Sequence, residues 1–361
     1  MVNAKGKVGI VTIQGRFNYG NRLQNYAVDW IYRQSGYTAE SLLLDRPFSI
    51  MQAAKNTTKK LLGKMPPAPE SMMSANRLAA FDKFNSCIAL RTLKSLSEEV
   101  IDEYCFFSAG SDQIWRMGRS AYDEDWRFLQ FSRPEQRIAL APSFGTDAPL
   151  SSAQLRRLAK YIDGYSRISV REETGARFIK EASGRDASII CDPTLVLSVQ
   201  DWHSVADERI IPNYDYVFAY LLGGVSEETE KVLDVASRQG ELPVIYLSDR
   251  EKEGEPAAGP AEFISLIENA SWIVTDSFHG SVFSAIFQRP LTIVRRGGNS
   301  AKRPQMFGRL ETLADKLGIE HKIYGSQDFD FSRSADYEGV SEAIERERSK
   351  FMEYLEACLS A

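Results

Sequence analysis

The chain has 361 residues, which is longer than a domain with a single hydrophobic core usually is, so we expect two domains. Apolar residues make up 43% and charged residues 26%, a composition that excludes a disordered or fibrous protein. The net charge of −5, with both signs interspersed, gives no indication of nucleic-acid binding.

The first half of the chain alternates apolar runs of strand length with amphipathic segments. Strands are predicted at residues 8–13, 41–44, 104–109, 137–143, 168–171 and 188–191. The first helix carries Leu23, Ala27, Trp30 and Ile31 on one face and ends at Gly36. Buried strands that alternate with helices are typical of a parallel sheet covered on both faces.

The second half repeats this alternation with a different sequence. Strands are predicted at 216–222, 243–247, 272–275 and 291–294, with helices at 227–239, around Phe263, at 280–287 and around Leu313. We therefore predict an α/β fold with an N-terminal Rossmann-like domain over 1–200 and a C-terminal one over 212–335. The polar segment 199–213 is the predicted hinge, and the helix within 338–361 is expected to cross back to the first domain.

The segment 47–100 departs from the pattern and reads as an insertion. It is rich in Lys and Met and contains the turn-forming stretch MPPAPESMM, which is typical of a lid or binding element. Within 55–65, Lys60 and Lys64 share a helical face beside Leu61, Leu62 and Met65. Two interpretations stay open: a lid helix packed on the first domain, or a peripheral contact with an anionic membrane.

The cysteines and the N-terminus indicate a cellular location. Four cysteines lie far apart without zinc-type spacing, and Cys105 and Cys191 fall in apolar runs, so we expect buried, reduced thiols. The apolar run that follows Lys7 is too short for a signal peptide, and no stretch is long enough to span a bilayer. A cytoplasmic protein is expected, and its oligomeric state is left open.

One of three histidines is a candidate for catalysis. His279 lies in TDSFHGS, after a predicted strand and before a predicted helix, where ligands of open α/β sheets bind. Backbone N–H groups of Gly280 and Ser281 are expected to hold a phosphate there, and the imidazole is suited to donate a proton. The alternative is a capping turn whose histidine merely packs. His203 and His321 are expected at the surface.

Polar residues follow three other predicted strands. Arg171 ends one strand and is suited to grip a carboxylate or phosphate, the alternative being a salt bridge to Glu172 or Glu173. One loop contains Asn18, Gly20 and Asn21, and another contains Asp112 and Gln113. Their side chains are suited to bind sugar hydroxyls, the alternative being that these residues simply shape turns. The sequence has no Gly-x-Gly-x-x-Gly after the first strand and no His or carboxylate cluster, so no cofactor and no metal are expected.

The motifs NYGNRLQNYA, AGSDQIW, ISVREETGA, ICDPTLVL and IVTDSFHGSVFSAIF occur in this order over roughly residues 7–325. In this the chain resembles the polysaccharide pyruvyl transferase family. The resemblance implies two Rossmann-like domains facing across a cleft, similar to B-type glycosyltransferases. It also implies transfer of the enolpyruvyl group of phosphoenolpyruvate onto two sugar hydroxyls as a ketal. The acceptor would be a cell-surface polysaccharide or its lipid-linked precursor.

The resemblance further implies that Arg171 and His279 contact phosphoenolpyruvate. Two positions depart from the family pattern: Ser277 stands where an Arg is common, and Asn21 stands where an Asp is common. Arg295 or Arg296 is expected to supply the missing charge. In the expected mechanism Arg171 and Arg295 hold the anion near Ser277, His279 protonates the methylene carbon, and Asp112 accepts the proton of the hydroxyl.

Three alternatives remain at this point. The first is a glycosyltransferase of the same fold that uses a nucleotide sugar. The second is a non-catalytic relative that binds glycan, and the third is an enzyme of the same ancestry acting on a small metabolite.

Overall fold

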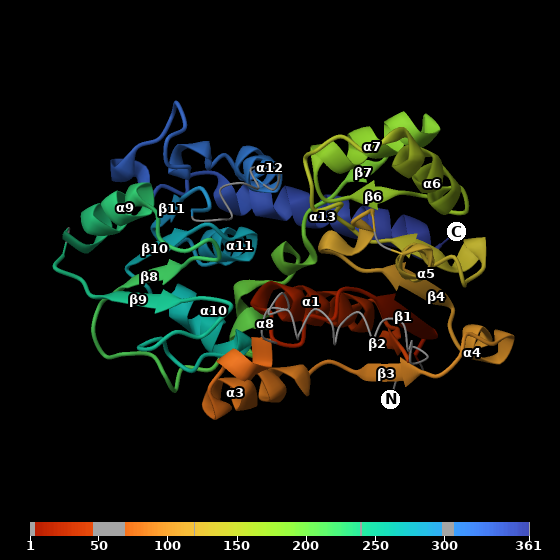
Figure 1. Ribbon diagram of the computed structural model, residues 1–361, viewed down its shortest axis with the longest axis horizontal. Helices are drawn as coiled ribbons and strands as arrows, with labels where there is room; N and C mark the ends of the chain where they lie inside the picture. The colour runs from red at the N-terminus through yellow and green to blue at the C-terminus, as the bar shows by residue number, and fades with distance from the viewer. Residues whose placement is uncertain (1–3, 46–68, 119, 239, 298–306, 361) are drawn as a thin grey trace, which may run out of the picture.

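The computed structural model describes residues 4–45, 69–118, 120–238, 240–297 and 307–360. Two α/β halves lie side by side, each built around its own parallel sheet (Figure 1). The prediction of two Rossmann-like halves that face across a cleft is confirmed. The domain boundaries at 1–200 and 212–335 stay a prediction.

The first sheet has five parallel strands in the order β3-β2-β1-β4-β5, which is the Rossmann order. The strands are β1 Lys7–Val11, β2 Thr38–Leu44, β3 Leu90–Leu93, β4 Phe106–Ala109 and β5 Arg137–Ala139. Val8 of β1 lies opposite Ala39 on one side and Phe106 on the other. An apolar run forms β1 because helices and neighbouring strands cover it on every side.

Helices of the first half are α1 Tyr19–Gln34, α4 Glu98–Asp102, α5 Ala121–Arg127, α6 Ser152–Ile162 and α7 Glu173–Ser183. The strands predicted at 168–171 and 188–191 do not join the first sheet. They form β6 Ser169–Val170 and β7 Ser188–Ile189, a separate parallel pair. The predicted strand 137–143 is also shorter, because Ala141 adopts the left-handed conformation (φ 53°) and turns the chain.

The second sheet has the order β11-β10-β8-β9, again all parallel. Its strands are β8 Val217–Tyr220, β9 Val244–Leu247, β10 Trp272–Thr275 and β11 Leu291–Ile293. Its helices are α9 Glu227–Arg238, α10 Pro260–Glu268, α11 Phe278–Ile286 and α12 Gly308–Leu317. Helix α11 begins two residues earlier than predicted, so His279 lies inside the helix rather than before it.

The predicted insertion contributes to both halves. Strand β3 is the edge of the first sheet, whereas α3 Ala75–Asn85 packs against α10 of the second half. The stretch 55–65, for which lid and membrane contact were both considered, lies outside the described residues. In the ranges that are described, no helix is long and apolar enough to cross a membrane.

One hydrophobic core runs through both halves. It contains Ile10 of the first sheet, Ile273 of the second and α1 between them. Tyr19 of α1 packs on Tyr220 and Phe263 of the second half, with ring centroids 5.6 and 5.1 Å apart. The predicted hinge is therefore not a free linker: it forms α8 Val199–His203, whose Trp202 is fully buried in this core.

The last helix, α13 Val340–Leu359, passes behind both halves (Figure 1). Ser341 near its start accepts a hydrogen bond from Gln288 of the second half. Further along, Arg348 donates to the carbonyls of Leu195 and Leu197 at 2.8 and 2.6 Å. Cys358 near its end is buried in the shared core.

All four cysteines are free, and Cys191 is buried as predicted. The prediction for Cys105 is wrong, since its thiol is exposed. Cys105 directly precedes the first residue of β4 and so lies outside the strand.

Candidate functional site

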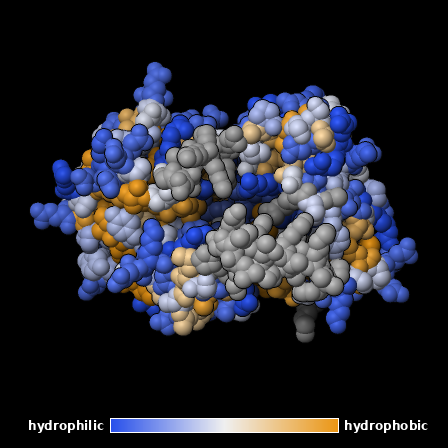
Figure 2. Space-filling model, viewed as in Figure 1, coloured by the Kyte–Doolittle hydropathy of each residue, from blue (hydrophilic) through white to orange (hydrophobic). Residues whose placement is uncertain are grey.

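A cleft of about 690 Å³ lies between the two halves. Its walls come from the loops that follow β1, β4, β8, β9, β10 and β11, all at the carboxyl ends of strands. In each sheet the strand order reverses between two of these strands, β1 and β4 in one and β8 and β10 in the other. Such reversals are where open α/β sheets bind ligands. On the face seen in Figure 2, a hollow with hydrophilic residues opens between the halves.

The two loops of the first half meet at the cleft. Asn18 caps α1, its side chain accepting the Asn21 N–H at 3.0 Å. The Asn21 amide in turn donates to the Asp112 carboxylate. Asp112 has a left-handed φ of 62°, a conformation that is unusual outside glycine and that occurs here in the tight turn after β4. Gln113 follows and also lines the cleft, with its side chain against Gly145.

His279 occupies the first turn of α11, behind the capping residue Ser277. It is 7% exposed and forms part of the cleft lining. Its ring rests on the backbone of Gly20, where any Cβ would collide with the imidazole. Its Nε2 lies 3.9 Å from the Asp192 carboxylate and has no hydrogen-bond partner among the described residues. Burial lowers the pKa of His279, so the imidazole is neutral near pH 7.

The N–H groups predicted to hold a phosphate are already engaged. Gly280 N–H donates to the Ser277 hydroxyl at 3.4 Å, and Ser281 N–H donates to the Ser277 carbonyl at 3.0 Å. Position 280 requires a glycine, because a Cβ there would collide with the Thr275 side chain. The first N–H groups of a helix have no partner within it, and here those belong to Phe278 and His279, both at the cleft wall. Any anion at this helix end would therefore meet N–H groups two residues earlier in the chain than predicted.

Arg171 is buried behind the cleft wall and does not line the cleft. Its guanidinium donates to Asp192, lies 3.5 Å from Asp112 and stacks 4.5 Å from the Phe278 ring centre. Burial alone would raise the pKa of Asp192, but Arg171, His279 and the hydrogen bonds from Thr194 together lower that pKa to about 2. The salt bridge considered for Glu172 is long, at 3.8 Å. Arg171 therefore lies behind the cleft wall in a cluster of buried charges, and its predicted contact with phosphoenolpyruvate stays a prediction.

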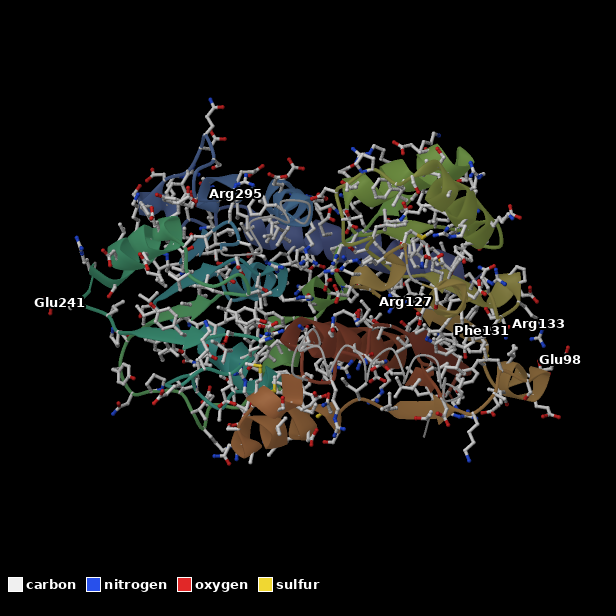
Figure 3. The ribbon with its side chains drawn as sticks, in the orientation of Figure 1. Glu98, Arg127, Phe131, Arg133, Glu241 and Arg295 are labelled. Atoms are coloured by element: carbon white, nitrogen blue, oxygen red, sulfur yellow. The ribbon has the colours of Figure 1, made fainter. Side chains whose placement is uncertain are left out.

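Two other arginines face the cleft. Arg309 of α12 lies 3.9 Å from Asp112, and burial lowers its pKa to about 10, so it remains charged at neutral pH. Arg296 lies 3.9 Å from Asp276. Arg295, predicted to hold the anion, points elsewhere: it is exposed, stacks on Phe307 at 4.2 Å and lies 3.7 Å from Glu311 (Figure 3). Successive residues at a strand end face opposite ways, which is why only one of the pair lines the cleft.

Asp276 shapes the opposite wall. Its carboxylate accepts the N–H groups of Leu222 and Gly223, each at 2.7 Å, and so fixes the glycine turn after β8. A side chain on Gly223 would press on Arg296 and on Asp276 itself. This wall therefore presents backbone to the cleft.

The remaining histidines lie outside the cleft. His203 is exposed and pairs with Glu268 at 2.5 Å, as predicted for a surface group. His321 is buried, contrary to prediction, because its short 3-10 turn docks beside β11. In the described ranges, no group of three or more His, Cys, Asp or Glu side chains is placed to hold a metal ion.

Among the charged residues that sequence reasoning missed, Asp192 and Arg309 lie beside His279 and Asp112. Asp192 stands in the ICDPTLVL motif, whose acidic residue after a strand was a usable signal. Arg309 lies in an amphipathic helix well beyond the last strand, and no local pattern distinguishes it. It reaches the cleft only because α12 folds back against α11.

Comparisons with known proteins give one family match. The family model described as polysaccharide pyruvyl transferase matches residues 18–297. No curated protein matches the chain significantly in sequence.

Among solved structures, similar chains include S. aureus MnaA with UDP (10% identity, TM-score 0.47, covering 96% of this chain and 90% of that one). The UDP-GlcNAc 2-epimerase of Methanocaldococcus jannaschii has 10% identity and a TM-score of 0.46, covering 98% and 93%. A glycosyltransferase from Rickettsia africae has 9% identity and a TM-score of 0.44, covering 99% and 96%.

Proposed function

Since the chain belongs to the polysaccharide pyruvyl transferase family, we propose that it transfers the enolpyruvyl group of phosphoenolpyruvate onto two hydroxyls of an acceptor sugar. The family makes it a glycan-modifying transferase. The donor, the ketal product and an acceptor in a cell-surface polysaccharide or its lipid-linked precursor are our proposal.

The observation that carries the proposal is the start of α11 in the cleft. The first two N–H groups of α11, those of Phe278 and His279, lie there beside the His279 imidazole, with Arg309 and Arg296 also lining the cleft. A helix N-terminus and two guanidinium groups suit an anion that carries both a phosphate and a carboxylate. Arg309 takes the role that the sequence suggested for Arg171 and Arg295.

Ser277, Gly280 and Ser281 support the donor indirectly, by closing the first turn of α11. Arg171 does so through Phe278, on which its guanidinium stacks, and through Asp192, which faces His279. The proposed donor site thus consists of the cleft-lining residues Arg309, Arg296 and His279, with a further group of buried charges behind them.

The reaction begins with protonation of the methylene carbon of phosphoenolpyruvate, which becomes a methyl group and leaves a cationic centre at the adjacent carbon. A sugar hydroxyl attacks that carbon and loses its proton. The bond from the same carbon to the phosphate oxygen then breaks, and inorganic phosphate leaves. The second hydroxyl attacks, loses its proton and closes the ketal, so that donor and diol yield ketal and phosphate.

His279 is the proposed proton donor. Its imidazole is neutral in the unliganded protein, because burial disfavours the charged form. A bound dianion nearby favours the charged form, so the proton arrives together with the donor. Asp112 is the proposed base for the hydroxyl, with Asn18, Gly20, Asn21 and Gln113 forming the acceptor side of the cleft.

The test is binding of phosphoenolpyruvate, followed by turnover. Phosphoenolpyruvate should raise the melting temperature by mass action, and the rise should shrink with added salt. With an acceptor glycan present, phosphate should be released and the product should carry a pyruvate ketal. His279→Ala should lose turnover, whereas His203→Ala, a matched change of an exposed histidine, should keep it.

Stabilisation by a nucleotide sugar and none by phosphoenolpyruvate would replace this proposal with the glycosyltransferase alternative. Full turnover by His279→Ala would remove His279 from the mechanism.

A further inference from the structure

The two ring nitrogens of His279 have different surroundings. Nε2 is buried, lies 3.9 Å from the Asp192 carboxylate and makes no hydrogen bond to any residue that the structure describes. The Nδ1 side of the ring rests on Gly20, which lines the cleft together with His279 itself. A neutral imidazole carries one proton, so one of its nitrogens donates and the other accepts. The nitrogen that holds the proton therefore decides what the ring presents to a ligand in the cleft.

The carboxylate of Asp192 is fixed by contacts on both of its oxygens. Its Oδ1 accepts from the N–H and from the hydroxyl of Thr194, at 3.0 and 2.6 Å. Its Oδ2 accepts from Arg171 and, at 3.3 Å, from the Ser111 hydroxyl. Asp192 and Thr194 are buried, and the Thr194 N–H requires an acceptor, so the carboxylate cannot rotate. Oδ2 is thereby held as the oxygen that faces His279.

The charges around the ring favour a proton on Nε2. The 3.9 Å separation exceeds hydrogen-bond range, so the preference at this distance is electrostatic. A lone pair on Nε2 would face the negative Oδ2 of Asp192, whereas an N–H is attracted to it. The N–H groups of Arg171 that make no hydrogen bond lie nearer to other carboxylates, Nη2 at 3.5 Å from Asp112 and Nε at 3.8 Å from Glu172.

We propose that Asp192 is a positioning residue, which holds the proton of neutral His279 on Nε2 and leaves Nδ1 to exchange a proton with the donor. This inference rests on the proposed function, since it names the atom through which His279 acts. When phosphoenolpyruvate binds, Nδ1 takes up a proton from solvent. The π electrons of the donor's methylene carbon then form a C–H bond with that proton. The N–H electron pair stays on Nδ1, and the ring returns to its neutral form with a proton on Nε2.

The test reads the tautomer of His279 directly and without a ligand. Protein labelled with ¹⁵N in its three histidines gives long-range ¹H–¹⁵N spectra, in which a protonated and a bare ring nitrogen have separate shifts. Spectra of His203→Ala and His279→Gln assign the signals. At pH 8, where the buried imidazole is neutral, His279 should carry its proton on Nε2. A wild-type ring protonated mainly on Nδ1 overturns the proposal.

Asp192→Asn should invert this tautomer. The Thr194 N–H can only donate, so the new amide turns its oxygen toward Thr194 and its NH2 group toward Nε2 of His279. Nε2 must then accept, which moves the ring proton to Nδ1, and the ring can no longer take up a second proton when the donor binds. The kcat should fall at least ~100-fold while the KM for phosphoenolpyruvate changes less than about threefold, because only proton transfer is impaired.

Glu172→Gln is the matched control, since it neutralises another buried carboxylate near Arg171, one that lies 3.8 Å from that guanidinium. It should keep the proton of His279 on Nε2. If Asp192→Asn alone does not fold, the double variant with Arg171→Met removes both charges of the buried pair, and the same inversion is expected.

An uninverted tautomer in the Asp192 variant, or inversion with an unchanged kcat, overturns the proposal. The melting-temperature rise with phosphoenolpyruvate is measured on the same samples. Because the tautomer is read without a donor, the two failures are separate. No rise in wild type removes the proposed function, whereas an uninverted tautomer with the rise intact removes only the role of Asp192.

Discussion

The imidazole of His279 is held between the backbone of Gly20 and the carboxylate of Asp192. These contacts come from opposite halves of the molecule: α11 brings the histidine, whereas Gly20 and Asp192 belong to the first half. The residue is thus buried and oriented before any ligand binds. Preorganisation of this kind suits the role of proton donor that we propose for His279.

We predict that phosphoenolpyruvate binding takes up protons at pH 7 to 7.5 through His279. Burial puts the pKa of the unliganded imidazole below its usual 6.5, so it is unprotonated there, and the bound dianion raises that pKa. Calorimetry in buffers of different ionisation enthalpy measures the uptake. His279→Gln should take up fewer protons than wild type, and equal uptake would contradict the role.

The same pKa shift has a consequence for stability. A histidine whose pKa is lower in the folded than in the unfolded state binds its proton more weakly in the folded protein. As the pH falls through 6.5, the unfolded chain is protonated first, so the free energy of unfolding falls. His279→Gln should show a smaller loss of stability than wild type between pH 7.5 and 5.5, measured by urea unfolding.

Substitution of Arg171 should mainly affect stability, and substitution of Arg309 should mainly affect donor binding, although both side chains lie beside Asp112. Arg171→Met leaves the buried Asp192 without its cation, which should cost about 3–5 kcal/mol of unfolding free energy. Arg309→Met removes a cation that lines the cleft, so it should weaken phosphoenolpyruvate binding at least tenfold with a smaller loss of stability. Urea unfolding and donor titration of the same two proteins check this. Weaker donor binding for Arg171→Met alone would reverse the assignment.

At the scale of elements, helix α3 joins the two halves on one side of the cleft. Its fully buried Arg77 donates to the Tyr19 hydroxyl at 3.0 and 2.6 Å and to the Ser248 carbonyl, and pairs with Glu255 at 3.3 Å. Tyr19 begins α1, whereas Ser248 and Glu255 belong to the loop that follows β9 and supplies Asp249 and Arg250 to the cleft. This described part of the predicted insertion therefore connects the two halves through buried polar contacts.

Arg77→Met should therefore lower the unfolding free energy by about 3–5 kcal/mol, because it leaves Glu255 buried and unpaired. The double variant with Glu255→Gln should recover part of that loss. Arg238→Met, which breaks the exposed pair with Asp234, should cost less than about 1 kcal/mol. Equal losses of unfolding free energy for Arg77→Met and Arg238→Met in urea would show that the buried pair stabilises the protein no more than the exposed one.

At the scale of the whole molecule, the two halves share one core and one closing helix. Rings of Tyr26, Trp202 and Phe283 pack in sequence across the junction, with centroid distances of 5.8 and 4.8 Å. The cleft between the halves is consequently a preformed space whose walls are fixed by buried contacts.

This shared core predicts that both halves unfold in a single transition. Trp115 is buried in the first half and Trp272 in the second, so variants that retain only one of them report on each half. Their fluorescence transitions in urea should coincide, the mark of cooperative unfolding. Two separate midpoints would show that the halves are independent units.

The sequence by itself determined the secondary structure around the cleft and the residues that follow its strands. Both the apolar run that forms β1 and the polar loops that contain Asn18 and Asp112 are local features of the sequence. Because parallel strands bring their carboxyl ends to one edge, chain order was enough to place Asn18, Asn21, Asp112, Gln113 and His279 at one site.

Only the tertiary structure decided which charges face the cleft. Arg171 and Arg309 differ in depth, and Arg295 and Arg296 differ in direction, because of contacts with segments far away in the chain. The sequence likewise could not reveal that Ser277 accepts the hydrogen bonds of the Gly280 and Ser281 N–H groups. A shift of one or two residues in where α11 begins decides which N–H groups stay without a partner in the helix. Burial and orientation arise from packing between distant elements, and a local pattern carries no record of that packing.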